Sequence, residues 1–100
     1  MKKRFTGEPM ALAIEISWYR IWNVVARGGD ISAELDHHVS ICRRGGDTRQ
    51  PDQIRVEVVD QINEAISLGQ VLDRLQEKRK LIDAAVRQAM GMVNKDDNSA

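Results

Sequence analysis

Glycines at three places divide the chain into segments that each carry a helical repeat of apolar residues. The interruptions are Gly28-Gly29, Gly45-Gly46 and Gly69. A residue without a Cβ atom readily adopts the left-handed conformation that ends helices. Between the glycines, apolar residues recur every three or four positions, which is typical of amphipathic helices. The sequence therefore predicts an all-α fold: a small single-domain bundle of about four helices with short Gly-containing turns.

The spacing places these helices at residues 10–26, 31–44, 51–67 and 72–93. A short basic N-terminal arm is expected at 1–9, ending in the turn Gly7-Glu8-Pro9, and a polar flexible tail at 94–100. Asp30 has a side-chain oxygen suited to capping the second helix, and Pro51 suits the first turn of the third. Residues 10–19 and 54–59 also alternate in polarity as strands do, so a strand at either place stays open.

The last helix carries a heptad pattern. Its members step by four and three and are Leu68, Leu72, Leu75, Arg79, Ile82, Val86, Ala89 and Val93. Such a pattern describes a seam for helix pairing, in which a polar seam residue such as Arg79 limits indiscriminate association. Two interpretations follow: the helix packs on the other three, or its seam forms a homodimer or grips a partner helix.

The charge balance excludes one class of partner. The 100 residues hold 15 Lys and Arg against 15 Asp and Glu, and both halves of the chain are balanced as well. Non-specific affinity for nucleic acid comes from a surplus of Lys and Arg, so a generic polyanion binder is not expected. A small dimeric DNA-binding regulator that pairs through 72–93 remains an alternative. Its candidate cations are Arg49, Arg55, Arg74, Lys78, Arg79 and Lys80.

Residues suited to catalysis or metal binding are few. Glu34, His38 and Cys42 lie four residues apart, and zinc prefers imidazole and thiolate ligands. On a helix, however, the three span about 12 Å, which is too far for one ion to touch all of them. A Cys–His nucleophile pair also needs an orienting group and an oxyanion donor from other elements. We expect no enzyme activity, no metal and no cofactor or small-molecule substrate.

The string Arg-Gly-Gly-Asp occurs twice, at 27–30 and 44–47. A glycine-rich loop at a helix start can bind phosphate through its backbone N–H groups. Neither copy has the Lys-Ser/Thr of a nucleotide-binding loop, and the two aspartates would repel an anion. We interpret both copies as the stop of one helix followed by the start of the next.

All four aromatic residues lie between positions 5 and 22, so the rest of the chain builds its core from aliphatic residues. Trp, Tyr and Arg are enriched at the energetic centres of protein interfaces. We therefore predict partner contacts at Trp18, Tyr19, Arg20 and Trp22, together with Arg79 in the heptad seam. Trp18 and Trp22 share a helical face, and the alternative for them is that they anchor the core.

The compartment is expected to be the cytoplasm. No apolar run reaches the roughly 18 residues of a membrane span, and a single cysteine, Cys42, fits a reducing environment. The basic opening Met1-Lys2-Lys3-Arg4 is not expected to be a secretory signal, because Glu15 and Arg20 interrupt the apolar stretch behind it. No membrane partner is expected.

The N-terminal third resembles a known family. Its residues Met1-Lys2-Lys3-Arg4-Phe5-Thr6-Gly7-Glu8-Pro9 and Leu12-Ala13-Ile14-Glu15-Ile16-Ser17-Trp18-Tyr19-Arg20-Ile21-Trp22 are similar to the anti-RecBCD accessory proteins of lambdoid bacteriophages. The resemblance implies a phage protein that binds the host RecBCD helicase–nuclease through its RecC subunit. Binding would modulate or inhibit processing of DNA ends, protect phage DNA and favour phage recombination. A helical protein–protein adaptor or assembly factor is a further alternative.

Overall fold

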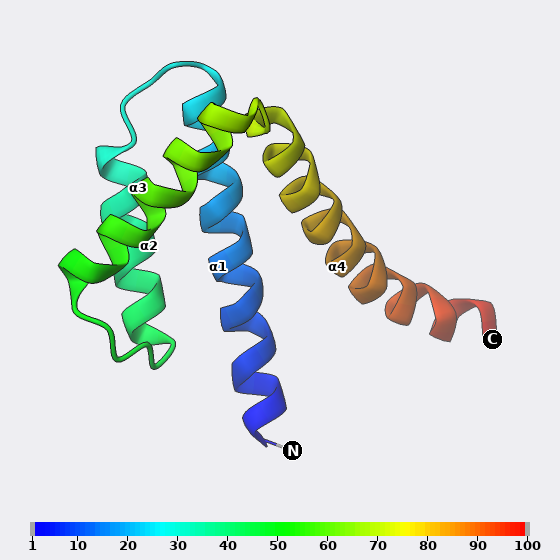
Figure 1. The fold of residues 1–100 in the computed structure, drawn as a ribbon. Helices are drawn as coiled ribbons and strands as arrows, with labels where there is room; N and C mark the ends of the chain where they lie inside the picture. The colour runs from blue at the N-terminus through cyan, green and yellow to red at the C-terminus, as the bar shows by residue number, and fades with distance from the viewer. Residues whose placement is uncertain (1, 100) are drawn as a thin grey trace.

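The computed structural model describes the backbone of residues 2–99 and the side chains of residues 10–90 (Figure 1). Over this range the chain forms four helices and no strand: α1 (Lys2–Ala26), α2 (Ser32–Arg44), α3 (Pro51–Leu68) and α4 (Val71–Ser99). The predicted all-α bundle of about four helices is confirmed. The two stretches that alternate in polarity, 10–19 and 54–59, are helical and belong to α1 and α3. No helix in the described part of the chain has an apolar stretch long enough to cross a bilayer.

The outer bounds of the first and last helices differ from the prediction. α1 begins at Lys2, so the backbone at Gly7-Glu8-Pro9 is helical and does not form the expected turn. Proline lacks a backbone N–H and so removes one hydrogen bond from a helix, but here the helix continues through it. α4 extends to Ser99, through most of the segment predicted as a tail, 94–100. The side chains of both segments lie outside the described residues, as does the flexibility expected of the tail.

Three helices end at a glycine with a positive φ: Gly28 (72°), Gly46 (97°) and Gly69 (68°). At each end the next amide donates a hydrogen bond back to a carbonyl five residues earlier. The bonds join Gly29 to Val24 (2.9 Å), Asp47 to Cys42 (3.1 Å) and Gln70 to Ala65 (2.8 Å). This is the left-handed glycine stop that the sequence predicts.

Each Arg-Gly-Gly-Asp string lies at the end of a helix, as expected. The predicted capping by its aspartate is wrong, because Ile31 and Gln50 are the N-cap residues of α2 and α3 and neither has a side-chain cap bond. The Asp30 Oδ1 atom accepts the Ser32 amide at 3.0 Å, and the Asp47 Oδ1 atom accepts the Arg49 amide at 2.9 Å. Each aspartate side chain thus accepts a hydrogen bond from the backbone amide two residues later and fixes a local turn. The first turn lies just before α2 and the second lies in the connection to α3. Pro51 occupies the first turn of α3, as predicted.

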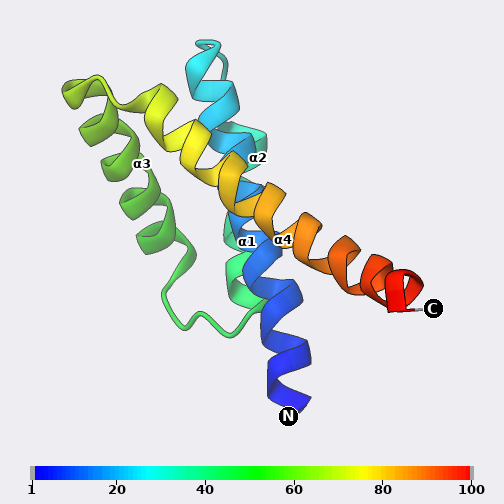
Figure 2. The ribbon, with the colours of Figure 1, turned by 90° about the vertical axis from the view of Figure 1, so that its right-hand side faces the viewer.

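Each helix packs against two others: α1 and α3 each contact both α2 and α4. α1 and α4 run in opposite directions and diverge toward the two ends of the chain (Figures 1 and 2). The core lies where the four helices meet. Its buried members are Ile21, Trp22, Val39, Cys42, Ile54, Val58, Ile62 and Ala65. Burial of one large aliphatic or aromatic side chain contributes about 1.5–3 kcal/mol.

The predicted heptad seam of α4 does not coincide with the face that packs on the bundle. Leu75 and Ile82 are half-buried, whereas Leu72 and Val86 are 62% and 46% exposed and Arg79 is exposed. The half-buried face follows Val71, Leu75, Lys78, Ile82 and Ala85, which also step by four and three but share only Leu75 and Ile82 with the predicted seam. The heptad seam therefore divides between the packed face and solvent.

Candidate functional site

A chain of three hydrogen-bonding side chains crosses the contact between α1 and α2. The His38 Nδ1 atom lies 3.0 Å from the Ser17 Oγ atom, and its Nε2 atom lies 3.5 Å from the Cys42 Sγ atom. Ser17 and His38 are each 2% exposed and Cys42 is 5% exposed. The indole of Trp18 meets the imidazole ring edge-on, with 4.8 Å between the ring centroids. Every nitrogen of this buried imidazole therefore has a polar partner.

Burial sets the protonation states of this chain. It lowers the pKa of His38 to about 4, with the positive charges of Arg49 and His37 acting in the same direction. Burial also raises the pKa of Cys42, and the nearby carboxylate of Asp47 adds to the rise. At neutral pH the imidazole is neutral and the thiol is protonated. The arrangement thus lacks the thiolate that a cysteine nucleophile or metal ligand requires.

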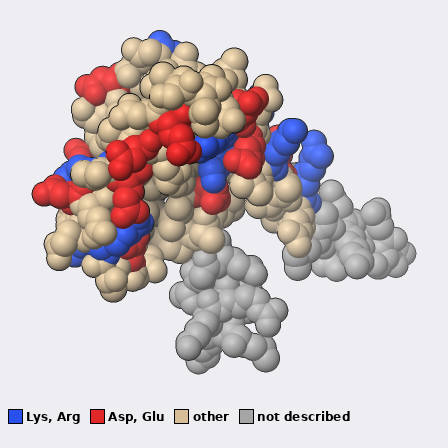
Figure 3. Space-filling model, viewed as in Figure 1, with Lys and Arg blue, Asp and Glu red and all other residues tan. Residues whose placement is uncertain are grey.

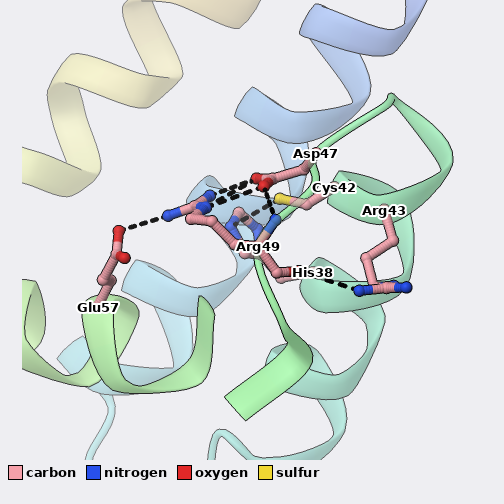
Figure 4. A network of polar contacts seen from close by, with 6 residues as sticks. All are labelled: His38, Cys42, Arg43, Asp47, Arg49 and Glu57. Carbon is pink, nitrogen blue, oxygen red and sulfur yellow. Dashed lines mark hydrogen bonds and ion pairs between the residues drawn. The ribbon is translucent and has the colours of Figure 1, made fainter. Parts of the chain in front are cut away.

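Beside these residues, Arg49 is held between two carboxylates (Figure 4). Its Nε and Nη2 atoms donate to Asp47, and its Nη1 atom donates to Glu57 of α3. Hydrogen bonds from Arg49 lower the pKa of Asp47 to about 2. The Nη1 atom of Arg43 donates to the Arg49 carbonyl oxygen at 2.9 Å. The connection between α2 and α3 is therefore tied to both helices.

A cavity of about 200 Å³ lies between these two groups of residues. Its walls combine polar and apolar side chains and come from Ile14, Trp18, His38, Cys42, Asp47, Arg49, Ile54, Glu57, Val58 and Gln61. The charge of Arg49 is compensated by Asp47 and Glu57, and His38 is neutral at pH 7. The cavity consequently offers no uncompensated positive charge to an anionic ligand.

Truncation of the hydrogen-bonded chain at Ser17 provides a test of its structural contribution. We expect Ser17→Ala to lower the free energy of unfolding by about 1–3 kcal/mol, because the His38 Nδ1 atom would lose its buried partner. Ser40→Ala, at an exposed position of α2, is the matched control and should change it by less than about 0.5 kcal/mol. Urea denaturation followed by circular dichroism measures both. Equal effects of the two substitutions would contradict a buried hydrogen bond at Ser17.

The spacing Glu34, His38, Cys42 does not gather into one site. Glu34 faces Arg20 of α1, with 3.8 Å between the charged atoms, whereas His38 and Cys42 contact each other. Among the side chains of residues 10–90, no three His, Cys, Asp or Glu residues come together in a group that could hold a metal ion.

Two of the residues predicted to contact a partner belong to the core. Trp22 is 1% exposed, so it is not available to a partner, and the alternative interpretation as a core anchor holds for it. Trp18 is partly buried and stacks on Trp22, with ring centroids 5.9 Å apart and planes 19° apart. The Arg74 guanidinium of α4 lies over the Trp22 ring, 5.9 Å from its centroid. The tryptophans thus join α1 to α2 and α4.

The other predicted residues lie at the surface. Arg20 is exposed and pairs with Glu34 at the edge of the contact between α1 and α2. Tyr19 and Arg79 line the same groove between α1 and α4, although they are sixty positions apart in the sequence. We call this the α1–α4 groove; it has a volume of about 290 Å³ and is lined by Ile16, Tyr19, Arg79, Ile82 and Asp83.

Most of the cations considered for DNA contact are engaged by carboxylates. Arg49 pairs with Asp47 and Glu57, Arg55 with Asp36 and Asp52, Arg74 with Glu64, and Lys78 with Glu15. On the face drawn in Figure 3, Lys and Arg lie among Asp and Glu. Such interleaved charges are typical of solvated helix surfaces.

Sequence reasoning missed the link from Ser17 to His38 and the bridge from Arg49 to Glu57. Spacing shows that His38 and Cys42 share a helical face, but nothing in the sequence indicates that Ser17 of another helix meets them. The i,i+4 spacing of His38 and Cys42 was the only available signal.

Comparison with known proteins identifies no relative: no protein-family model matches the chain, and no curated protein or solved structure matches it.

Proposed function

We propose that this chain acts by binding another protein through the α1–α4 groove, without catalysing a reaction. The resemblance of the N-terminal third to phage anti-RecBCD proteins identifies the partner that we propose: the RecC subunit of the host RecBCD helicase–nuclease in the bacterial cytoplasm. Binding would modulate or inhibit processing of DNA ends, and phage DNA and phage recombination would benefit.

The observation that carries the proposal is the position of Tyr19 and Arg79 in one groove. Both belong to residue types that dominate the energy of protein interfaces. The groove places the tyrosine ring and the guanidinium beside apolar surface from Ile16 and Ile82. An apolar surface with a few polar groups that fix orientation is the usual composition of the centre of an interface.

The surface charges support a protein partner over DNA. Duplex binding needs Lys and Arg side chains that can displace counterions from phosphates. Four of the six candidate cations already pair with carboxylates of the chain, among them Arg49 and Arg55. A DNA-binding role would require these pairs to break, which lowers the gain from each phosphate contact.

Binding to purified RecBCD tests the proposal directly. We expect the wild-type chain to bind immobilised RecBCD. Tyr19→Ala and Arg79→Ala should each weaken the affinity by about tenfold or more, since truncation of a side chain at an interface centre costs about 2 kcal/mol or more. Arg27→Ala is the matched control, because Arg27 is exposed in the turn after α1, and should leave the affinity unchanged. Biolayer interferometry with full-length chains gives the constants.

Two results would overturn the proposal. Absence of RecBCD binding by the wild-type chain, under conditions in which a known RecBCD ligand binds, removes the named partner. A gel shift of duplex DNA that weakens steeply with salt would instead favour the DNA-binding regulator.

A further inference from the structure

The outward face of α4 carries a second heptad seam that is rotated from the packed face by about one residue, or 100°. Its positions step by four and three and are all exposed: Leu72, Gln76, Arg79, Asp83, Val86 and Met90. We call these six residues the outer seam. Its three apolar members, Leu72, Val86 and Met90, are 62%, 46% and 59% exposed. A rotation of about 100° about the helix axis separates this seam from Leu75 and Ile82, which face the bundle.

The outer seam is complementary to a reversed copy of itself. Its apolar residues lie at the two ends, and its opposite charges, Arg79 and Asp83, lie on either side of the centre at position 81. An antiparallel second copy centred there places Arg79 opposite Asp83, Leu72 opposite Met90, and Gln76 opposite Val86. In a parallel pair in register, Arg79 would meet Arg79 and Asp83 would meet Asp83, and like charges at such distances repel. The charge pattern therefore selects the antiparallel orientation.

The two charged residues are free to serve a second copy. Neither Arg79 nor Asp83 forms an ion pair with another side chain among residues 10–90, although both line the α1–α4 groove. By contrast, Lys78 on the neighbouring face pairs with Glu15 of α1. The cation that faces the bundle is thus neutralised within the chain, and the pair on the outer seam is not.

We propose that the chain forms an antiparallel homodimer in which the outer seam of one α4 packs against the outer seam of the other. The second copy's α4 enters the α1–α4 groove, where Ile16 and Tyr19 of α1 meet it. Two α1 helices and two α4 helices then form a four-helix layer about a twofold axis at position 81. Such an interface uses the same surface patch on both subunits, as closed dimers do.

The size and composition of the seam predict a weak dimer. The seam extends over eighteen residue steps, or about 27 Å of helix, and three of its six positions are polar. On the flank of the seam, Asp73 of one chain would face Arg87 of the second. Lys80 of one chain would lie near Lys80 of the other, and the repulsion between these two like charges would oppose association. Interfaces of this kind belong to the small, transient class. We expect association to depend on protein concentration in the micromolar range.

Charge reversal tests the register on the purified full-length chain by sedimentation velocity across a concentration series. In the proposed dimer, position 79 of each chain lies opposite position 83 of the other. Arg79→Asp places two carboxylates opposite each other at both of these contacts, and Asp83→Arg places two guanidinium groups there. Each should raise the dimer dissociation constant by about tenfold or more. The double variant R79D/D83R restores opposite charges and should return the constant to within about threefold of wild type. Arg27→Asp makes the same change of charge away from the seam and should have no effect.

Disulfide trapping tests the orientation. A mixture of chains carrying Leu72→Cys and chains carrying Met90→Cys should cross-link rapidly under mild oxidation, and Leu72→Cys alone should cross-link slowly. Cys42 is buried, so it does not compete. A wild-type chain that stays monomeric at all concentrations, a double variant that fails to recover, or rapid cross-linking of Leu72→Cys to itself would each overturn the proposal.

The self-association does not depend on the proposed RecBCD binding, since it is measured on the pure chain. The RecC subunit and a second copy of the chain would both contact Tyr19 and Arg79. A protein partner at the groove would therefore compete with the second copy. Failure of the dimer therefore leaves RecBCD binding untouched, and failure of RecBCD binding leaves the dimer untouched.

Discussion

Ile54→Ala is expected to lower the free energy of unfolding by about 2–5 kcal/mol. The Ile54 side chain is fully buried in the core, next to the cavity that His38 and Cys42 also line. The substitution removes buried aliphatic surface and enlarges the cavity that Ile54 lines together with Arg49 and Glu57. Since the surroundings can collapse only partly, the loss exceeds the transfer free energy of the removed atoms.

Ile66→Ala is the matched control for this prediction. It makes the same chemical change on the same helix, α3, at a side chain that is 56% exposed. We expect a change of less than about 0.5 kcal/mol. Urea denaturation of both variants under identical conditions gives the two values. The data are fitted with one common m value, the slope of the free energy of unfolding against urea concentration. If Ile66→Ala were as damaging as Ile54→Ala, the buried and exposed faces of α3 would be wrongly assigned.

Local sequence signals predicted the helices because each signal acts within a few residues. Gly28, Gly46 and Gly69 adopt the positive φ that ends a helix, and their bonds close over five residues. Pro51 occupies a first turn for the same local reason. The start of α1 was predicted wrongly because Gly7 and Pro9 are strong breakers on average, and here the backbone continues as a helix through both.

The faces of the helices depend on partners that the sequence does not specify. A 4-3 pattern over Leu68–Val93 cannot distinguish a seam that packs within the chain from one that packs outside it. The position of α1 decides this: Leu75 and Ile82 turn toward the bundle and Leu72 and Val86 turn away. Contacts between helices distant in sequence, such as that of Ser17 with His38, were unpredictable for the same reason.

α1 supplies residues to three different surroundings, which explains why its aromatic cluster was hard to interpret. Trp22 enters the core and Trp18 packs between the core and His38, whereas Tyr19 faces the α1–α4 groove. Trp18 and Trp22 are four residues apart and share a helical face, whereas Tyr19 is rotated by about 100° from Trp18. The five predicted partner contacts therefore separate into two groups. Trp18 and Trp22 anchor the core, whereas Arg20 pairs with Glu34 at the surface and Tyr19 and Arg79 line the α1–α4 groove.

The stability of the fold is expected to fall as the pH decreases from 7.5 toward 4, because protonation of His38 favours the unfolded state. In the native chain, burial holds the pKa of His38 at about 4, whereas the unfolded chain titrates near 6.5. Between these values the unfolded state binds a proton that the native state does not, so the free energy of unfolding rises with pH. The expected loss is about 2 kcal/mol between pH 7.5 and 5, and roughly 3 kcal/mol by pH 4.

The adjacent histidine provides the control for this pH dependence. His37→Gln removes an exposed imidazole and should preserve the slope, whereas His38→Gln should flatten it between pH 7.5 and 5, where most carboxylates stay ionised. The direct measurement is the NMR titration of the His38 imidazole Cε1 proton, whose resonance should shift only near pH 4. A His38 resonance that titrates above pH 6 would show that the imidazole is solvated, and the Ser17–His38–Cys42 chain would then not be the buried, neutral element that joins α1 to α2.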